Sequence, residues 1–292
     1  PMPYYIGDVI TDYKKLVIRT PEDFQKNGIS VKINTRVEDI DARKGMMRLS
    51  DGTDIPYDIL VMATGADAVR LDIPGADMEG VFVMRNLMDT LKLKSYLSEN
   101  ACRKAVLIGA GYIGMEMCEN LHKLGIKTTV LDVLPRPVVR WDAEFSKMVL
   151  DELEKNDVPF LPETKPLAVE KGKENRLVLK TDKGDLDADI ILMGVGTRRN
   201  VSLARAAGVE MGESGAIKVD FKQKTSKDGV YAVGDCCEVY HRVAKRWVYF
   251  PLGDIANKQG RVAGQNIGGA QAEFPGIVGA QSFKVFNLEV GA

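Results

Sequence analysis

Three glycines near the middle of the chain have the spacing of a phosphate-binding turn. Gly109, Gly111 and Gly114 form the pattern Gly-x-Gly-x-x-Gly, after a strand-like apolar run at residues 104–108 and before helical spacing over residues 112–124. In such a unit the first glycine permits a tight turn, the second lets the backbone approach a pyrophosphate, and the third lets the helix pack closely. Backbone N–H groups at the helix start would then hold the phosphates. The pattern predicts a dinucleotide site, and a glycine turn without a ligand is the alternative.

A carboxylate follows at the position where such a site needs one. Residues 127–132 are predicted to form the next strand, which ends at Asp132, 18 residues after Gly114. There a carboxylate would accept hydrogen bonds from the adenosine ribose hydroxyls. This favours NADH, because a 2′-phosphate would be repelled. Arg136 lies close enough in the sequence to leave NADPH open.

Two side chains on the predicted helix could act on a ligand in front of the phosphates. Tyr112 is bulkier than the loop needs and would project towards such a ligand. Glu116 lies where the helix dipole alone favours an acid, so a structural and a functional interpretation both stay open. The only histidines, His122 and His241, have no third partner that would support a hydrolase triad.

The elements that position these residues belong to an internal repeat. Residues 26–65 and 155–196 each predict a short strand, a hairpin and a buried apolar strand ending in glycine. Only the second copy follows a Gly-x-Gly-x-x-Gly pattern. Because repeats determine architecture, we expect two related nucleotide-binding halves, the first of them incomplete at its start.

Other glycines end predicted strands where a cofactor could pass. Gly234-Asp235 ends the apolar run of residues 230–233, and a carboxylate at the carboxyl end of a parallel strand points into the ligand crevice. An exposed aspartate that caps a turn is the alternative. The repeat strands end in ATG at 63–65 and GVG at 194–196, which simple turns would also explain. The remaining predicted elements are helices over residues 86–99, 143–155 and 252–267 and one strand over residues 283–290.

Length and composition are those of an ordinary globular chain. The 292 residues are 45% apolar, which is compatible with two domains. Forty basic and 41 acidic residues give no sign of a nucleic-acid footprint. No apolar run reaches the roughly 20 residues of a membrane span, and no signal-peptide layout is present. The four cysteines lack zinc or CxxC spacing, so we expect reduced, packed thiols in a cytoplasmic protein and no metal site.

As a set, ATG at 63–65, GAGYIGME at 109–116, GVG at 194–196 and VYAVGD at 230–235 resemble the pyridine nucleotide–disulfide oxidoreductases. These are flavoproteins with two dinucleotide-binding domains. The segments MPYYIG at 2–7, PLG at 251–253 and ANKQGR at 256–261 are similar to the branch of coenzyme A disulfide reductase, NADH oxidase and NADH peroxidase. The resemblance implies an α/β fold with two Rossmann-like domains of the three-layer ββα type, the NAD domain being inserted in an incomplete FAD domain.

The resemblance also implies the domain ranges. Residues 1–101 would be an FAD domain lacking its first βαβ unit, residues 102–219 the NAD(H) domain, and residues 220–275 the second part of the FAD domain. Residues 276–292 would begin a C-terminal dimerisation domain. The chain is thus expected to be truncated at both ends, and the complete protein to be a homodimer.

Roles for individual residues follow from the same resemblance. Tyr112 would be the lid over the flavin face and Glu116 would lie close to the nicotinamide, whereas the reactive cysteine is not in this chain. Where the family usually has Pro-Asn after GVG, this chain has Thr197-Arg-Arg-Asn200, which departs from the pattern. The expected NAD(H)-binding residues are Gly109, Gly111, Tyr112, Ile113, Gly114, Asp132, Val195 and Gly196. The expected FAD-binding residues are Val37 (at the adenine), Thr64, Gly65, Gly234, Asp235 (at the ribityl or pyrophosphate region), Leu252 and Gly253 (near the flavin ring).

The implied activity is flavin-dependent electron transfer. Electrons would pass from NAD(P)H through FAD to a cysteine centre and then to a disulfide, a persulfide or oxygen, and the sequence does not name the acceptor. Two alternatives stay open. One is a thiol-independent NADH dehydrogenase or ferredoxin reductase type of flavoprotein, and the other is a non-catalytic NAD-binding module.

Overall fold

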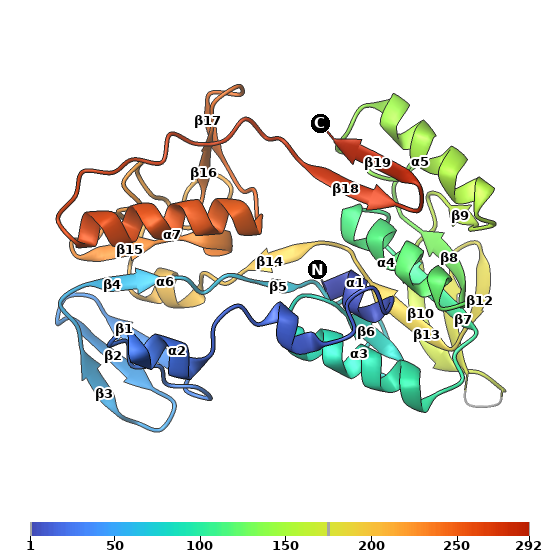
Figure 1. Cartoon of the computed structure of the whole chain (residues 1–292), viewed down its shortest axis with the longest axis horizontal. Coiled ribbons are helices and arrows are strands. Elements are labelled where there is room, and N and C mark those ends of the chain that lie inside the picture. Colours follow the sequence, from blue (N-terminus) through green and yellow to red (C-terminus); the bar gives the residue numbers. More distant parts are fainter. Residues whose placement is uncertain (1, 174–175, 292) are drawn as a thin grey trace. The chain divides into compact units, whose positions relative to one another are not determined.

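The computed structural model describes residues 2–173 and 176–291, and the chain divides into two compact units (Figure 1). Unit 1 contains the residues up to Thr20, Ala68–Thr197 and the residues from Gln281 on, and unit 2 contains Pro21–Asp67 and Arg198–Ala280. These limits differ from the expected domain ranges. Residues 68–101 enter unit 1 because a strand at Val81–Val83 pairs with its central sheet.

Unit 1 is built around a parallel sheet of five strands in the order β6-β13-β7-β8-β9. Along β7, Ala105 and Leu107 face one hydrophobic cluster, whereas Val106 and Ile108 face another. Both faces of the strand are therefore covered, which explains its unbroken apolar run. The strands are β6 (Val81–Val83), β7 (Lys104–Ile108), β8 (Lys127–Leu131), β9 (Phe160–Leu161) and β13 (Ile190–Met193).

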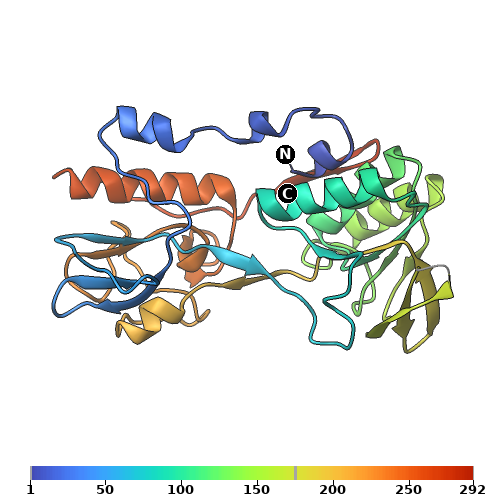
Figure 2. The same cartoon turned by 90° about the horizontal axis from the view of Figure 1, so that it is seen from below.

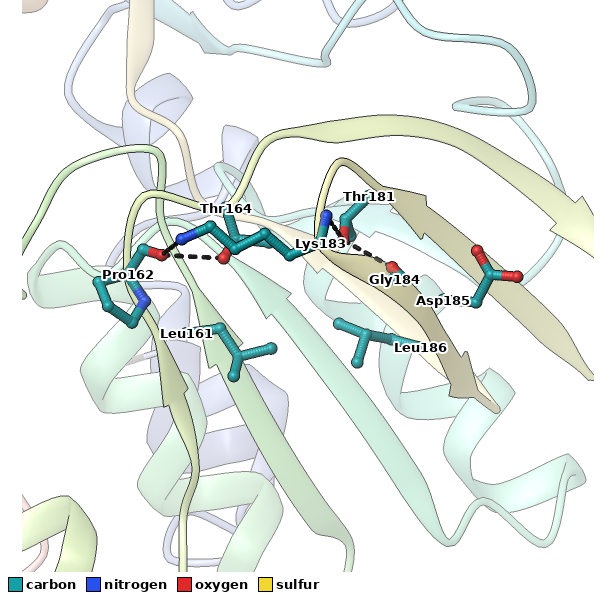
Figure 3. A pocket seen from close by; sticks show the side chains of 8 residues that line it. All are labelled: Leu161, Pro162, Thr164, Thr181, Lys183, Gly184, Asp185 and Leu186. Carbon is teal, nitrogen blue, oxygen red and sulfur yellow. Dashed lines mark hydrogen bonds between the residues drawn. The ribbon is translucent and has the colours of Figure 1, made fainter.

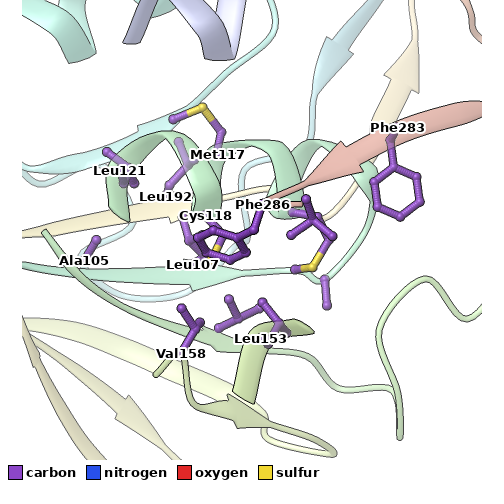
Figure 4. Close-up of a cluster of buried hydrophobic side chains, with 14 of the residues drawn as sticks. Ala105, Leu107, Met117, Cys118, Leu121, Leu153, Val158, Leu192, Phe283 and Phe286 are labelled. Carbon is purple, nitrogen blue, oxygen red and sulfur yellow. The ribbon is translucent and has the colours of Figure 1, made fainter. Parts of the chain in front are cut away.

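The two faces of this sheet have different covers. Figure 2 shows the helices of unit 1 above its strands and a three-stranded antiparallel sheet, β10-β11-β12, below them. Buried side chains from α4, α5 and the sheet form the core on the helical face (Figure 4). The covering elements are α1 (Met2–Ile6), α3 (Leu87–Glu99), α4 (Tyr112–Lys123), α5 (Ala143–Lys155), β10 (Pro166–Lys171), β11 (Leu177–Thr181) and β12 (Gly184–Ala188).

Local sequence explains where these helices begin. In α3 the Asn86 side chain accepts a hydrogen bond from the Asp89 backbone N–H at 2.9 Å, and the Asp89 carboxylate accepts one from the Asn86 N–H at 3.2 Å. This reciprocal capping box satisfies two N–H groups that the helix cannot satisfy itself. The helices predicted over 86–99 and 143–155 are confirmed, the first to within one residue at its start.

Unit 2 repeats the arrangement on a smaller scale. Its parallel pair, β4 and β15, also has two buried faces, because Val230 and Ala232 pack in one cluster and Tyr231 and Val233 in another that includes Ala263 of α7. A three-stranded antiparallel sheet, β1-β2-β3, matches β10-β11-β12 in unit 1. The elements are α2 (Pro21–Lys26), β1 (Val37–Asp41), β2 (Met46–Leu49), β3 (Asp54–Pro56), β4 (Leu60–Met62), α6 (Ser202–Ala206), β15 (Val230–Ala232), β16 (Val239–His241), β17 (Arg246–Val248) and α7 (Gly253–Ile267). A short pair, β5 (Ala66–Ala68) and β14 (Thr197–Arg199), lies at the unit boundaries.

The repeat is confirmed in its hairpins, and the two copies differ in the segment that precedes them. In the second copy β9 pairs with β8, so it is a strand of the central sheet. In the first copy residues 29–33 form no strand, and Ile29 and Ile33 are exposed by 51% and 64%. The short strand predicted in the first copy is β1 (Val37–Asp41), which lies after this segment. No helix within the described ranges is both long and apolar enough to cross a membrane.

The C-terminal segment is a hairpin, whereas the sequence predicted a single strand over 283–290. β18 (Ser282–Val285) pairs antiparallel with β19 (Leu288–Gly291). The turn between them is Phe286-Asn287, and Phe286 adopts a positive φ of 52°. This turn lacks the Asn-Gly or Asp-Gly sequence that usually indicates a hairpin, which is why the single strand was predicted.

Two buried carboxylates hold the turn of this hairpin onto unit 1. Glu119 of α4 accepts a hydrogen bond from the Phe286 N–H at 3.1 Å, and Glu152 of α5 accepts one from the Asn287 N–H at 3.0 Å. Only 1% of Glu119 and 6% of Glu152 is exposed. Both carboxylates also pair with a lysine of their own helix. The hairpin is therefore fixed to two helices through its backbone as well as through its apolar side chains.

We expect Glu119→Ala to lower the free energy of unfolding by about 1–3 kcal/mol, because the buried Phe286 N–H loses its acceptor. Urea unfolding would measure the change. Glu154→Ala, an exposed position on α5, is the matched control and should stay within about 0.5 kcal/mol of the unchanged protein. Equal stability of the two variants would show that the carboxylate does not hold the turn.

Candidate dinucleotide-binding sites

The three glycines of the fingerprint differ in the space around them. Gly109 has a φ of +104°, and a Cβ there would lie 2.5 Å from the Gly194 carbonyl oxygen. A Cβ on Gly114 would lie 2.1 Å from the Gly109 oxygen, whereas nothing lies within 4 Å of one on Gly111. The outer glycines thus permit close packing, and the middle one leaves room in front of the backbone. This is the arrangement that a pyrophosphate requires.

The start of α4 presents this open turn to a ligand. Gly111 is the N-cap of the helix, and no side chain caps it. The first N–H groups of a helix have no intrahelical acceptor and attract phosphate oxygens. The residues present at this turn therefore fit a dinucleotide phosphate.

Asp132 follows β8 and is tied to the same turn. Its Oδ2 accepts a hydrogen bond from the Ala110 N–H at 2.8 Å, and its Oδ1 accepts one from the Leu134 N–H at 3.0 Å. A carboxylate has about four lone-pair sites, so the partly exposed side chain can still accept bonds from ribose hydroxyls. The predicted acid thus lies next to the predicted phosphate turn.

The GVG segment after β13 lies at the same sheet edge as the ends of β7 and β8. Gly194 N–H donates to the Ile108 carbonyl at 2.7 Å. Gly196 has a φ of +108° with open space around it, and Val195 packs on the core below. The residues after β13, β7 and β8 thus meet at the carboxyl edge of one sheet, where ligands of such folds bind.

Tyr112, Ile113 and Glu116 lie on the first turns of α4. Tyr112 is 38% exposed, Ile113 packs against the helical core, and Glu116 is half-buried. Burial raises the pKa of Glu116, and so does the neighbouring Glu119. Burial also raises the pKa of Tyr4 in α1, with Glu116 as the next cause. The lid role of Tyr112 and the nicotinamide role of Glu116 stay predictions.

In unit 2 the predicted FAD residues gather at the ends of β4 and β15. Thr64-Gly65 follows β4 and Gly234-Asp235 follows β15, and these strands are paired in parallel. Both glycines have positive φ angles, 64° and 77°. Asn200 holds the Thr64-Gly65 segment through two hydrogen bonds. Thr64 Oγ1 donates to the Asn200 carbonyl at 2.6 Å, and Asn200 Nδ2 donates to the Thr64 carbonyl at 3.2 Å.

The remaining predicted FAD residues lie at the start of α7 and in β1. Leu252 is the N-cap of α7 without a side-chain cap, and nothing would contact a Cβ on Gly253. Val37 begins β1 and packs against the core of unit 2. Gln259 of α7 is 1% exposed, and its Oε1 accepts a hydrogen bond from the Gly234 N–H at 2.9 Å. The helix start and the Gly234 turn are therefore linked through one side chain.

Sequence reasoning missed Asn200 and Gln259. A signal for Gln259 existed, since Ile255, Gln259 and Val262 have the spacing of one helix face and are all buried. A polar residue on a buried face needs partners, and here they are backbone groups. Nothing in the sequence around Asn200 indicates its bond to Thr64, which lies 136 positions away.

All four cysteines are free thiols, as predicted. Burial, and then Asp189, raises the pKa of Cys102 to about 11, and burial raises that of Cys118 to about 12. The pKa of Cys237 is also raised by burial. Thiolates are the nucleophilic form, so these side chains lack the chemistry of a redox centre. Among the described residues no group of three His, Cys, Asp or Glu could hold a metal ion.

A shallow pocket of unit 1 lies between the end of β9 and the β11–β12 turn (Figure 3). Two of its side chains bond to backbone groups of the lining: Lys183 Nζ donates to the Pro162 carbonyl at 2.8 Å, and Thr181 Oγ1 donates to the Gly184 carbonyl at 2.6 Å. None of the predicted cofactor residues lines it.

Two parallel-sheet units, each with an antiparallel sheet and a glycine-rich strand edge, define a protein with two Rossmann-like dinucleotide-binding domains. The family model for pyridine nucleotide-disulphide oxidoreductases matches residues 4–260. The chain belongs to this family, and the predicted fold class is confirmed.

Three similar proteins come from different organisms. The chain is 34% identical to an NADH oxidase of Methanocaldococcus jannaschii, over 99% of this chain and 66% of that protein. It is 30% identical to a coenzyme A disulfide reductase of Staphylococcus aureus, over 98% of this chain and 65% of that protein. The structure of a NAD-dependent persulfide reductase from A. fulgidus superposes with a TM-score of 0.92 at 33% identity, over 98% of this chain and 54% of the other. The chain thus spans less than two thirds of their length.

We expect Gly109→Ala to cost about 2–3 kcal/mol of stability, because alanine is strained at positive φ and its Cβ would clash with the Gly194 carbonyl. Gly111→Ala is the matched variant, and it should cost no more than about 1 kcal/mol because its Cβ enters open space. Chemical denaturation of both proteins measures the difference. Similar losses at the two positions would contradict the assigned roles.

We expect none of the four cysteines to react quickly with iodoacetamide at neutral pH in the folded protein. Burial keeps Cys102, Cys118 and Cys237 protonated and shields Cys236 from the reagent, and raising the pH towards 11 should accelerate the alkylation of Cys102 first. Mass spectrometry after timed alkylation checks this, with the urea-unfolded chain as the fully labelled control. Rapid labelling of one cysteine in the folded chain would mark it as a redox candidate.

Proposed function

We propose that the protein is a flavin-dependent oxidoreductase that takes electrons from NADH and passes them through FAD to a cysteine centre. The final acceptor is a disulfide, a persulfide or oxygen. The observation that carries the proposal is the open space at Gly111 between two tightly packed glycines, at the uncapped start of α4. The complete enzyme is proposed to be a cytoplasmic homodimer with small-molecule substrates.

Unit 1 supports the coenzyme half of this proposal. The Gly109–Gly114 turn would hold the pyrophosphate, Asp132 the adenosine ribose, and Gly196 would allow close approach on the other side of β7. Tyr112 and Glu116 lie on the helix that starts at this turn and would face the nicotinamide end. A charged carboxylate at Asp132 favours the ribose hydroxyls of NADH over a 2′-phosphate.

Unit 2 supports the flavin half. The backbone at Gly65 is open to close approach, a Cβ on Gly234 would lie 3.4 Å from the Cβ of Ala256, and Asp235 lies at the carboxyl end of β15. The start of α7 at Gly253 offers free N–H groups that favour negative charge. When bound, the flavin supplies the chemistry of accepting a hydride and passing electrons onward. The protein positions and shields it.

The choice of acceptor rests on the relatives. An NADH oxidase, a coenzyme A disulfide reductase and a NAD-dependent persulfide reductase are all similar to this chain. Burial raises the pKa of Cys102, Cys118 and Cys237, which is the opposite of what a redox centre needs, and Cys236 is fully buried. We therefore place that centre outside the 292 residues, and the acceptor is proposed only as one of these three classes.

A visible spectrum and an NADH titration of the full-length protein test the proposal. We expect a yellow protein whose flavin absorbance is bleached by NADH. Gly111→Val should abolish the bleaching, because its side chain fills the space for the pyrophosphate, while the yellow colour remains. A colourless protein that still binds NADH would instead indicate a non-catalytic module.

A further inference from the structure

The loop of residues 133–141, which follows Asp132, is attached to the Gly109–Gly114 turn through a strained residue. Val138 has a φ of +45°, which is a genuine outlier for a β-branched side chain, and it is buried. Its N–H donates to the Ala110 carbonyl at 2.9 Å. Ala110 lies between Gly109 and Gly111, so the strained residue bonds directly to the fingerprint. Backbone strain of this kind persists only where the surroundings enforce it.

This bond determines the direction of the next N–H group. The peptide between Ala110 and Gly111 is planar and trans, so its carbonyl and the Gly111 N–H point in opposite directions. With the carbonyl held by Val138, the Gly111 N–H points away from the loop. The Asp132 carboxylate holds the preceding peptide through the Ala110 N–H at 2.8 Å. Both peptides that flank Ala110 are therefore fixed from outside the turn.

Arg136 holds the loop in the shape that this bond needs. Its guanidinium donates to the Trp141 carbonyl at 2.9 Å, the Val139 carbonyl at 3.3 Å and the Ser146 hydroxyl at 2.5 Å. Ser146, itself 1% exposed, donates on to the Pro137 carbonyl at 2.7 Å. The Arg136 guanidinium thus holds several carbonyl groups of the loop in place through hydrogen bonds. In this arrangement both terminal nitrogens of the guanidinium, Nη1 and Nη2, donate to acceptors of the chain itself.

We propose that Arg136 is a positioning residue for the coenzyme: through the loop and Val138 it aims the Gly111 N–H at the pyrophosphate. The inference rests on the proposed coenzyme site and deepens it. It assigns to Arg136 a role in binding NADH and NADPH alike, because the pyrophosphate is common to both. A direct contact to the 2′-phosphate would instead favour NADPH alone.

The test measures NADH and NADPH affinity of the 292-residue chain by the fluorescence of the bound reduced nicotinamide. Arg136→Met keeps the length of the side chain and removes the guanidinium, and we expect both affinities to fall about tenfold with their ratio unchanged. Arg136→Lys should recover part of the loss. Arg140→Met removes an exposed arginine of the same loop and should leave both affinities unchanged. In the ligand-free protein the amide NMR signal of Gly111 should shift in Arg136→Met and not in Arg140→Met.

Each outcome of these measurements either supports or overturns the positioning role of Arg136. A selective loss of NADPH affinity, or an unchanged Gly111 signal, would overturn the positioning role. If Arg136→Met does not fold, Ser146→Ala, which removes one partner of the guanidinium without changing charge, must show the same parallel loss or the proposal fails. Absence of NADH binding by the unchanged chain would refute the proposed coenzyme site itself and is distinct from these results.

Discussion

The close approach of three backbone segments at the end of β7 is the constraint on which the rest of unit 1 depends. Gly109 lies against the Gly194 carbonyl, and Gly114 lies against Gly109, with no room for a Cβ at either contact. This brings the start of α4, where no side chain caps Gly111, onto the edge of the sheet. Of the three fingerprint glycines only Gly111 has open space in front of it, so the packing that builds the fold also leaves the opening that a phosphate would fill.

Both units contain parallel strands that are buried on both faces. A parallel strand is buried on its two faces, so its alternate residues enter different cores, as Leu107 and Val106 do in β7 and Ala232 and Tyr231 do in β15. The polar backbone at the strand ends is then exposed to whatever binds there. An antiparallel three-stranded sheet accompanies each parallel sheet, which is how the duplicated sequence pattern appears in space.

Side chains that bond to backbone groups make the strand ends rigid. Asn200 bonds to Thr64, Gln259 to Gly234, Asp132 to Ala110, and Arg136 to the carbonyls of its own loop. Buried or partly buried backbone groups need partners, and in turns no regular ladder supplies them. In each case one polar side chain supplies the missing partner. The geometry of both strand edges thus depends on a few side chains that need not contact a ligand themselves.

Local pattern in the sequence was enough to predict the fingerprint strand, turn and helix and the duplicated hairpins, because these depend on periodicity and on the unique freedom of glycine. It also placed Asp132 beside the Gly109–Gly114 turn, where its role in binding stays a prediction. It was not enough for the C-terminal hairpin, whose Phe286-Asn287 turn has no turn residue typical of a hairpin and is held by Glu119 and Glu152 from two distant helices. Nor could it show that Arg136 turns inward, since the Ser146 hydroxyl that it contacts comes ten positions later. Only the tertiary structure decides such matters, because a long polar side chain can bond in many directions and packing selects one.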